Sequence, residues 1–234
     1  MKTRTQVFLV GTLLLGSSGL ALVAIGNGSE APARFAVASI HLEQNATDRD
    51  GEIVIEAVGS GDGLAKLTVV APNGRTVLDV AAPDASTLGF REFRFESPEP
   101  RDVEKLKSGY PEGVYRFSGV SAAGAKLEGQ ARLSHRLPAP AAFLRPKAGA
   151  RDVAIRSLEI TWTPVRNLAG HVVYIEQPEL RVEITAKVPG SAVSFAVPDG
   201  FLVPGTEYQV GLGTVSAEGN ISFVETTMET AGKE

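Results

Sequence analysis

Short runs of alternating apolar and polar residues recur along the chain, and the clearest lies in its last third. The run Leu158–Trp162 reads Leu-Glu-Ile-Thr-Trp and ends on the only tryptophan. Such alternation predicts a strand with one buried face, and a lone tryptophan closing it predicts a side chain in the core. Further on, the turn Pro204-Gly205 leads to Tyr208, which opens another alternating run. This order predicts a tyrosine corner, whose hydroxyl caps a nearby loop carbonyl, and hence a β-sandwich.

The first half carries the same kind of pattern. Alternation begins at Phe35, and the following predicted strands cover residues 52–57, 64–70, 75–80 and 93–96. Asn73-Gly74 between two of these strands predicts a hairpin, because both residues tolerate positive φ. The segment that opens at Ser97-Pro98 predicts a short helical turn through about Leu106. With 25 glycines and 14 prolines placed between short strands, the chain is predicted to be all-β.

An internal echo predicts two related sandwiches in tandem. Pro111–Tyr115, a strand and the turn Ser121–Gly124 recur in order as Pro204–Tyr208, a strand and Ser216–Gly219. Between the halves, the stretch Leu137–Pro146 contains three prolines, which favour a stiff connection. We therefore predict sandwiches at residues 35–137 and 138–234 that share little apolar area.

The N-terminus predicts export. Lys2 and Arg4 precede an uncharged apolar stretch that reaches Gly26, as in an export signal. Cleavage is expected at Ala24-Ile25-Gly26, which is a better site than Ala31-Pro32-Ala33. An uncleaved anchor is the alternative, because about 20 apolar residues suffice to cross a bilayer. Residues 1–26 are thus a signal peptide or membrane anchor and residues 27–34 a spacer, and the protein is expected to be periplasmic, secreted or anchored at the cell surface.

Composition narrows the function classes. The net charge is −4 with a sequence pI near 5.5, and no lysine and arginine cluster appears, which argues against a nucleic-acid partner. There is no cysteine, so disulfides, thiolate metal sites and thiol nucleophiles are excluded. Export without cysteine fits a bacterial envelope better than an animal exterior.

Residues 138–230 resemble a fibronectin type III domain. The motifs are a proline-rich entry, Leu158–Trp162 as second strand, Gly170–Ile175 as third, and Leu202–Tyr208 leading into the sixth. The family's third strand often opens with an aromatic residue where this chain has His171, so the sequence leaves open which of its residues face the core. The whole chain is similar to exported bacterial fibronectin type III proteins without assigned activity. The resemblance implies a fold and carries over no site, because this fold hosts many functions.

The histidines and acidic residues give no metal site. His41, His135 and His171 stand far apart without metal-ligand spacing, so an exposed or capping role is favoured for each. Asp48-Arg49-Asp50-Gly51-Glu52 looks like a calcium loop, but its first and twelfth places fall on Ala46 and Ala57. A solvated turn is the better interpretation, with a partial calcium loop as the alternative.

Catalytic motifs are also missing. There is no Gly-x-Ser-x-Gly elbow, and the glycine cluster Gly59–Gly63 opens no helix that could hold a phosphate. The carboxylate pairs Glu96 and Glu99, and Glu225 and Glu229, are interpreted as charges at a strand exit and in the tail. The sequence therefore assigns no catalytic, cofactor-binding or metal-binding residue.

Sugar binding and glycosylation complete the alternatives. Trp162, Tyr115 and Tyr208 are expected to be buried, which leaves Tyr110 and Tyr174 as a thin platform for sugar. Asn27, Asn45 and Asn220 each begin an Asn-x-Ser/Thr sequon.

The sequence favours a non-catalytic exported binding or spacer module of the cell envelope, with a protein or envelope component as partner and membrane attachment through residues 1–26. The alternatives are an accessory domain of an extracellular hydrolase, or a small hydrolase, acting on polysaccharide or protein, and a self-assembling structural subunit.

Overall fold

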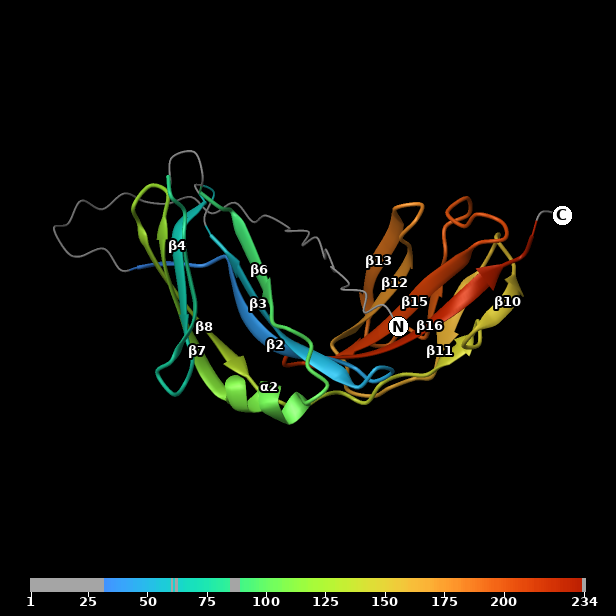
Figure 1. Cartoon of the computed structure of the whole chain (residues 1–234), viewed down its shortest axis with the longest axis horizontal. Coiled ribbons are helices and arrows are strands. Elements are labelled where there is room, and N and C mark those ends of the chain that lie inside the picture. Colours follow the sequence, from blue (N-terminus) through green and yellow to red (C-terminus); the bar gives the residue numbers. More distant parts are fainter. Residues whose placement is uncertain (1–31, 60, 62, 85–88, 233–234) are drawn as a thin grey trace. The chain divides into compact units, whose positions relative to one another are not determined.

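A computed structural model describes residues 32–59, 61, 63–84 and 89–232 (Figure 1). The predicted export segment, residues 1–26, lies outside the described residues. The described elements are β1 (Ala33–Arg34), β2 (Val37–Asn45), β3 (Asp50–Val58), β4 (Leu64–Val70), β5 (Thr76–Ala81), β6 (Glu92–Glu96), α2 (Val103–Gly109), β7 (Gly113–Ser121), β8 (Lys126–Leu133), β9 (Phe143–Arg145), β10 (Ala150–Val153), β11 (Glu159–Trp162), β12 (Gly170–Gln177), β13 (Val182–Pro189), β14 (Ser194–Ala196), β15 (Glu207–Val215) and β16 (Ile221–Thr230).

The two halves of the chain repeat one strand topology. In the first half, β2, β3 and β6 are neighbours, and β8, β7, β4 and β5 form the facing sheet. In the second half, β9, β11 and β14 are neighbours, and β16, β15, β12 and β13 follow in the same order. A short strand also runs parallel to the last strand of each half, β1 beside β8 and β10 beside β16. The prediction of an all-β fold built from sandwiches of the immunoglobulin and fibronectin type III kind is confirmed.

A direct strand pairing joins the halves. The first three residues of β16, Ile221 to Phe223, pair in parallel with Glu43 to Asn45 of β2. This pairing makes one sheet in which seven strands follow the order β13-β12-β15-β16-β2-β3-β6 and β10, beside β16, is the eighth. Figure 1 shows the red strand β16 meeting the blue strand β2. The sequence predicted only a stiff linker at this place.

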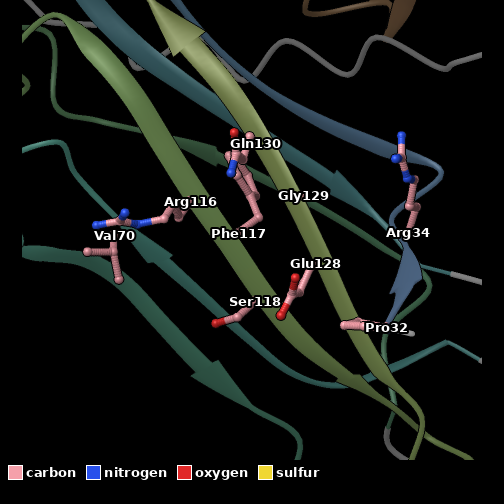
Figure 2. A pocket seen from close by; sticks show the side chains of 9 residues that line it. All are labelled: Pro32, Arg34, Val70, Arg116, Phe117, Ser118, Glu128, Gly129 and Gln130. Carbon is pink, nitrogen blue, oxygen red and sulfur yellow. The ribbon is translucent and has the colours of Figure 1, made fainter. Parts of the chain in front are cut away.

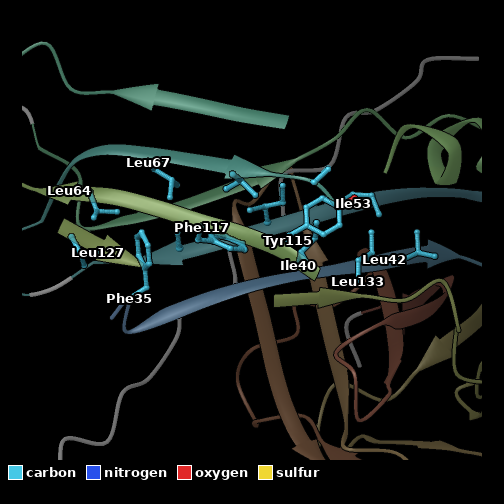
Figure 3. Close-up of a cluster of buried hydrophobic side chains, with 14 of the residues drawn as sticks. Phe35, Ile40, Leu42, Ile53, Leu64, Leu67, Tyr115, Phe117, Leu127 and Leu133 are labelled. Carbon is cyan, nitrogen blue, oxygen red and sulfur yellow. The ribbon is translucent and has the colours of Figure 1, made fainter. Parts of the chain in front are cut away.

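Each half has its own apolar core. In the first, Figure 3 shows Tyr115 of β7 beside Ile53 of β3, and Phe117 lies near Phe35, with ring centroids 6.3 Å apart. In the second, Trp162 is 1% exposed and donates its Nε1–H to the carbonyl of Ala192 at 3.1 Å, so the predicted core tryptophan is confirmed. The apolar clusters comprise residues between 35 and 137 and between 141 and 228. The exact domain limits at 137 and 138 stay a prediction.

Tyrosine corners occur in both halves, with opposite hydrogen bonds. Tyr115 donates its hydroxyl to the carbonyl of Pro111 at 3.0 Å. Tyr208 accepts a hydrogen bond from the backbone N–H of Val203 at 2.9 Å. The prediction that Tyr208 caps a carbonyl is therefore wrong in its chemistry, although the ring is fully buried as expected.

Two local predictions in the first half can be compared with the structure. The Asn73-Gly74 hairpin is confirmed: Gly74 has a φ of 84°, and the Asn73 side chain accepts from Arg75 N–H at 3.1 Å. The helix predicted from Ser97 to about Leu106 instead occupies Val103–Gly109. It begins there because Asp102 caps it, accepting from the backbone N–H of Lys105 at 3.1 Å.

The third strand of the second half, β12, now shows which of its residues face the core. Val173 and Ile175 belong to the core, whereas Tyr174 lies on the opposite face. His171 shares the core side and stacks obliquely on Trp162, with ring centroids 5.3 Å apart. The histidine thus occupies the place where the resembling family often has an aromatic residue.

Candidate functional site

The joint between the halves is built around Asn220, which is 1% exposed. Its Oδ1 accepts from the backbone N–H of Leu42 at 2.9 Å. Its Nδ2 donates to the carbonyls of Ser134 at 3.0 Å and Arg136 at 2.9 Å. Thus one side chain satisfies backbone groups of β2 and of the linker at once. Asn220 was predicted only as a sequon, and its burial leaves no room for a sugar in this conformation.

The linker is held along its length by the second sandwich. Ser222 donates its hydroxyl to the carbonyl of Pro138 at 2.7 Å, and Thr214 donates to the carbonyl of Ala139 at 3.0 Å. Glu218 accepts hydrogen bonds from Ser134 and Arg136, and these partners lower the pKa of its carboxyl. The linker is therefore held in place by hydrogen bonds from the second sandwich as well as by the limited flexibility of its prolines.

Beside the joint, β2, β3 and β6 carry an acidic face on the side of the sheet opposite the first core. Because strand side chains alternate, core residues such as Leu42 and Ile53 are followed by polar ones on the other face. We define the acidic face as His41 and Glu43 of β2, Glu52 and Glu56 of β3, and Arg94 and Glu96 of β6.

Arg94 is the central cation of the acidic face. Its Nε donates to Glu96 and its Nη1 to Glu56, both at 2.7 Å, and its Nη2 lies 3.6 Å from Oε1 of Glu43. Burial alone would lower the pKa of Arg94, but the hydrogen bonds to Glu96 and Glu56 and the charge of Glu43 raise it above its usual value. Arg94 therefore stays charged and orders three carboxylates around itself.

Glu43 and Glu52 stand directly opposite each other on neighbouring strands. They are 7% and 6% exposed, which is unusual for carboxyl groups. Glu43 lies 2.8 Å from Nε2 of His41. Burial, followed by the charges of Glu43 and Glu96, raises the pKa of Glu52 to about 9. Glu52 therefore holds its proton at neutral pH.

The acidic face continues onto the second sandwich. Tyr174 donates its hydroxyl to Glu225 of β16, and Gln209 lies 3.5 Å from the other oxygen of that carboxylate. Burial and then the charge of Glu225 raise the pKa of Tyr174. The ring of Tyr174 lies over Gly211, where a Cβ would come within 1.7 Å of a ring carbon. Glycine at this position therefore lets the aromatic ring lie flat on the sheet.

Most candidate residues of the sequence do not meet in one site. His41 contacts Glu43, His135 lies 2.8 Å from the carbonyl of Tyr110, and His171 packs on Trp162. Among the described residues no group of three histidine or acidic side chains is arranged to hold a metal ion.

The suspected calcium loop is a turn between β2 and β3. The Asn45 side chain accepts from the backbone N–H groups of Thr47 and Asp48 at 2.9 and 3.4 Å, and Arg49 adopts a φ of 63°. This confirms the interpretation as a turn. Glu52, however, leaves that turn and is buried in the acidic face.

The remaining acidic pairs divide in the structure. Glu96 is a ligand of Arg94, and Glu225 accepts from Tyr174, so neither is a simple surface charge. Glu229 lies inside β16, where it pairs with Glu207, and its carboxyl lies 3.7 Å from Arg151, so the interpretation as a tail charge is wrong. Part of the glycine cluster Gly59–Gly63 lies outside the described residues.

The proposed sugar platform is not formed by the residues considered for it. Tyr174 is 2% exposed, and Trp162, Tyr115 and Tyr208 are buried. Tyr110 is left half-buried. The expectation that Tyr174 could offer an exposed ring is wrong, because β12 places it against Gly211 and Glu225.

Surface hollows lie away from the acidic face. One of about 780 Å³ lies over β7 and β8, and Figure 2 shows Arg34 and Arg116 at its two sides with Glu128 between them. Another of about 620 Å³ lies beside Arg145 and Glu159 in the second sandwich. In the part of the chain that the structure describes, no helix is long and apolar enough to cross a membrane.

From the sequence, Glu43 and Arg94 were not predicted as site residues, and Glu52 and Asn220 were considered only in a calcium loop and in a sequon. A usable signal was the symmetry of the hairpin: once the turn is placed at residues 46–49, Glu43 and Glu52 must face each other. Nothing comparable in the sequence indicated that Asn220 would meet Leu42.

Comparisons with known proteins found similar solved structures, but no match among protein families or curated proteins. Similar solved structures include fibronectin(III)-like modules of Clostridium thermocellum CbhA, at 11% identity over 87% of this chain and 92% of that chain with a TM-score of 0.35. Others are the chicken CNTN1 FN1–FN3 domains (16% identity, 86% and 67% covered, TM-score 0.32) and a two-domain segment of chicken tenascin (15%, 85% and 99%, 0.32). At these identities the likeness concerns the fold, whose fibronectin type III character rests on the strand order described above.

Proposed function

We propose that the chain is a non-catalytic, exported tandem of fibronectin type III-like modules that serves as a binding or spacer module at the cell envelope. The observation that carries the proposal is the joint, in which Asn220 and the β2–β16 pairing tie the two modules together. A spacer must keep its binding surfaces at a set separation, and a fixed joint provides this property.

The joint is polar, and it combines the backbone pairing of β2 with β16 with hydrogen bonds from polar side chains to backbone groups. The two apolar cores remain separate, so the modules do not merge into one domain. Modules linked by a free chain move relative to each other by default. Here that motion is opposed by three kinds of contact. They are the three residue pairs between β2 and β16, the hydrogen bonds of Asn220, and the hydrogen bonds to the linker carbonyls of Pro138 and Ala139.

The fixed joint is testable by distance measurements, because the chain has no cysteine of its own. Spin labels at Gln130→Cys on β8 and Lys187→Cys on β13 would report the separation of the two modules by double electron–electron resonance. Both positions are exposed. We expect one narrow distance distribution, as narrow as that of the control pair Gln130→Cys and Thr76→Cys within one module. A distribution several times broader than the control would refute a fixed spacer.

Export needs its own test. The full chain would be expressed in a bacterial host, and the cells would be fractionated and analysed by N-terminal mass spectrometry. We expect the protein outside the cytoplasm. A mature terminus after Gly26 would indicate cleavage, and retained residues 1–26 would indicate an anchor. Cytoplasmic accumulation would contradict the envelope role.

The second candidate is an accessory domain of an extracellular hydrolase, or a small hydrolase, acting on polysaccharide or protein. Glu52 favours it in one respect, since a carboxyl that keeps its proton at neutral pH can act as a general acid. Hydrolysis of polysaccharide and protein substrates by the purified full chain would be measured. Turnover that disappears in Glu52→Gln would replace the spacer proposal by this one.

A further inference from the structure

Two buried carboxyl groups meet where the modules join. Glu43 and Glu52 are a directly opposed cross-strand pair, and such pairs place their Cβ atoms about 4.5–5.5 Å apart. Two like charges directly opposite each other on paired strands destabilise the sheet. Glu43 has partners in His41 and Arg94. Among the described residues, no hydrogen bond or ion pair is recorded to the carboxyl of Glu52.

The surroundings cannot neutralise a second charge. Arg94 already forms ion pairs with Glu43, Glu56 and Glu96. Besides Arg94, the charges that act on Glu52 are those of Glu43, Glu96 and Glu99, and His41 contacts Glu43. Further out, Asp50 and Glu225 act on Glu99, Asp48 and Arg101 act on Asp50, and Tyr174 of β12 donates to Glu225. Burial, then the charges of Asp50, Glu96 and Glu225, also raise the pKa of Glu99.

The weakest attachment around this pair is the joint itself. Glu43 is the residue of β2 that pairs with Ile221 of β16. The β2–β16 pairing has three residue pairs, whereas β2 and β3 pair over nine. On the opposite face, Leu42 and Ile53 hold β2 and β3 in the first core. Ile221 lies beside Glu43 in register, so opening the β2–β16 pairing gives water access to the carboxyl pair at the cost of three residue pairs, whereas parting β2 from β3 would break nine and disrupt the first core.

We propose that the Glu43–Glu52 pair is a pH-sensitive latch, which holds the two modules together while Glu52 carries its proton and releases the β2–β16 pairing when alkaline pH removes that proton to solvent.

The direction in which pH changes the stability of the closed joint follows from the protonation states of Glu52. Glu52 has a pKa of about 9 in the folded protein against an ordinary value of 4.5. From pH 4.5 upward the opened or unfolded form binds fewer protons than the closed form, so the closed form loses stability as pH rises towards 9. Above pH 9 both forms are ionised, and the loss is complete.

The test uses the full 234-residue chain with the spin-label pair Gln130→Cys and Lys187→Cys, measured from pH 6 to pH 10. We expect one narrow distance at pH 6 and a second, broader population that grows to at least half of the molecules by pH 10. Glu52→Gln has the shape of the protonated acid and no charge, so it should stay narrow throughout. Glu128→Gln on the exposed face of β8 is the matched control and should behave like the parent.

Carbon NMR of the Glu52 carboxyl provides an independent readout should Glu52→Gln fold poorly. Its titration midpoint in the labelled parent should coincide with the distance change, and Glu43→Gln should move the midpoint to lower pH by at least one unit.

The latch rests on the proposed fixed joint, but the two can fail separately. A broad distribution already present at pH 6 would overturn the fixed joint. A narrow distribution at every pH, or broadening that persists unchanged in Glu52→Gln, would overturn the latch alone. A Glu52 midpoint near that of an exposed glutamate would overturn it as well.

Discussion

Asn220 Oδ1 accepts a hydrogen bond from the backbone N–H of Leu42 at 2.9 Å, across 178 residues of sequence. The N–H of Leu42 belongs to β2, whose next residue starts the short pairing with β16. The amide of Asn220 therefore closes the end of a parallel strand pair where the sheet passes from one sandwich to the other. A buried N–H that lost this acceptor would remain unpaired, which is costly.

Asn220→Ala should lower the free energy of unfolding by about 1–3 kcal/mol, because it leaves buried backbone groups without partners. The sharper readout is hydrogen exchange of the Leu42 amide, which should speed up by more than tenfold. The amide of Ile53, which donates to Ser97 at 2.9 Å, should keep its rate relative to global unfolding.

Asn73→Ala is a control, since Asn73 is exposed and also accepts a backbone hydrogen bond, from Arg75. It should cost well under the Asn220 change and leave Leu42 exchange unaltered. Unchanged Leu42 exchange in Asn220→Ala would show that water replaces the side chain and that the joint does not depend on it.

His171 should make the second sandwich sensitive to acid. Its Nε2 is buried and has no hydrogen-bond partner among the described residues. Burial lowers the pKa of His171, and the hydrogen bond with the carbonyl of Pro189 opposes this shift. A histidine kept neutral in the fold contributes stability above its ordinary pKa of about 6.5, and this stability is lost as pH falls towards the folded value.

His171→Phe should remove that loss while preserving the contact with Trp162. The measurement is urea unfolding of parent and variant between pH 7.5 and pH 5, taking the difference at each pH so that other groups cancel. The variant should gain stability relative to the parent as pH falls. A constant difference would mean that His171 is accessible to solvent and protonates freely.

Trp162→Ala should destabilise the second sandwich by about 3–5 kcal/mol, because it removes a fully packed ring and leaves a cavity. Trp162→Phe keeps part of the packing but loses the hydrogen bond to Ala192, so its loss should be smaller. Thermal unfolding followed by calorimetry measures both. An unchanged melting temperature in Trp162→Ala would contradict the core assignment.

The two tyrosine corners should lose similar amounts of stability on removal of their hydroxyls. Tyr115→Phe leaves the carbonyl of Pro111 without its donor, and Tyr208→Phe leaves the N–H of Val203 without its acceptor. Each change should cost about 1 kcal/mol in urea unfolding. A loss from Tyr208→Phe as large as that from Trp162→Ala would show that the hydroxyl does more than close the corner.

Local patterns predicted most of the fold because each depends on neighbouring residues. Alternation at Leu158–Trp162 and the Asn73-Gly74 turn indicate strand and hairpin through short-range backbone preferences and burial. The joint could not be found in this way. Asn220 and Leu42 meet only after two sandwiches have formed, and a single asparagine carries no sign of its distant partner.

The acidic face was missed for a different reason. Glu43 and Glu52 lie in strands whose alternation was predicted correctly, but alternation assigns polar residues to a solvated face. Here the sheet continues through β16, and the polar face next to the pairing becomes buried. The chemistry of the site therefore depends on a sheet that the strand patterns of either half do not reveal.

Each sandwich should fold as a separate fragment, but the start of the second fragment should matter. The core of the second half begins at Ala141, so a fragment of residues 141–234 retains it. That fragment lacks the carbonyls of Pro138 and Ala139, which accept from Ser222 and Thr214. Because each neutral hydrogen bond contributes about 1 kcal/mol, residues 138–234 should be more stable than residues 141–234 by about 1–2 kcal/mol.

Urea unfolding of the two fragments, with residues 32–137 alongside, measures this difference. Replacing Thr214 by valine in the longer fragment removes one hydrogen-bond donor at nearly constant volume. This variant should lose about half of the stability difference between the two fragments. If residues 141–234 prove insoluble while residues 138–234 fold, residues 138–140 belong to the second module, in agreement with the predicted boundary at residue 138. If neither folds without residues 32–137, the β2–β16 pairing is a condition of folding and the modules are not independent.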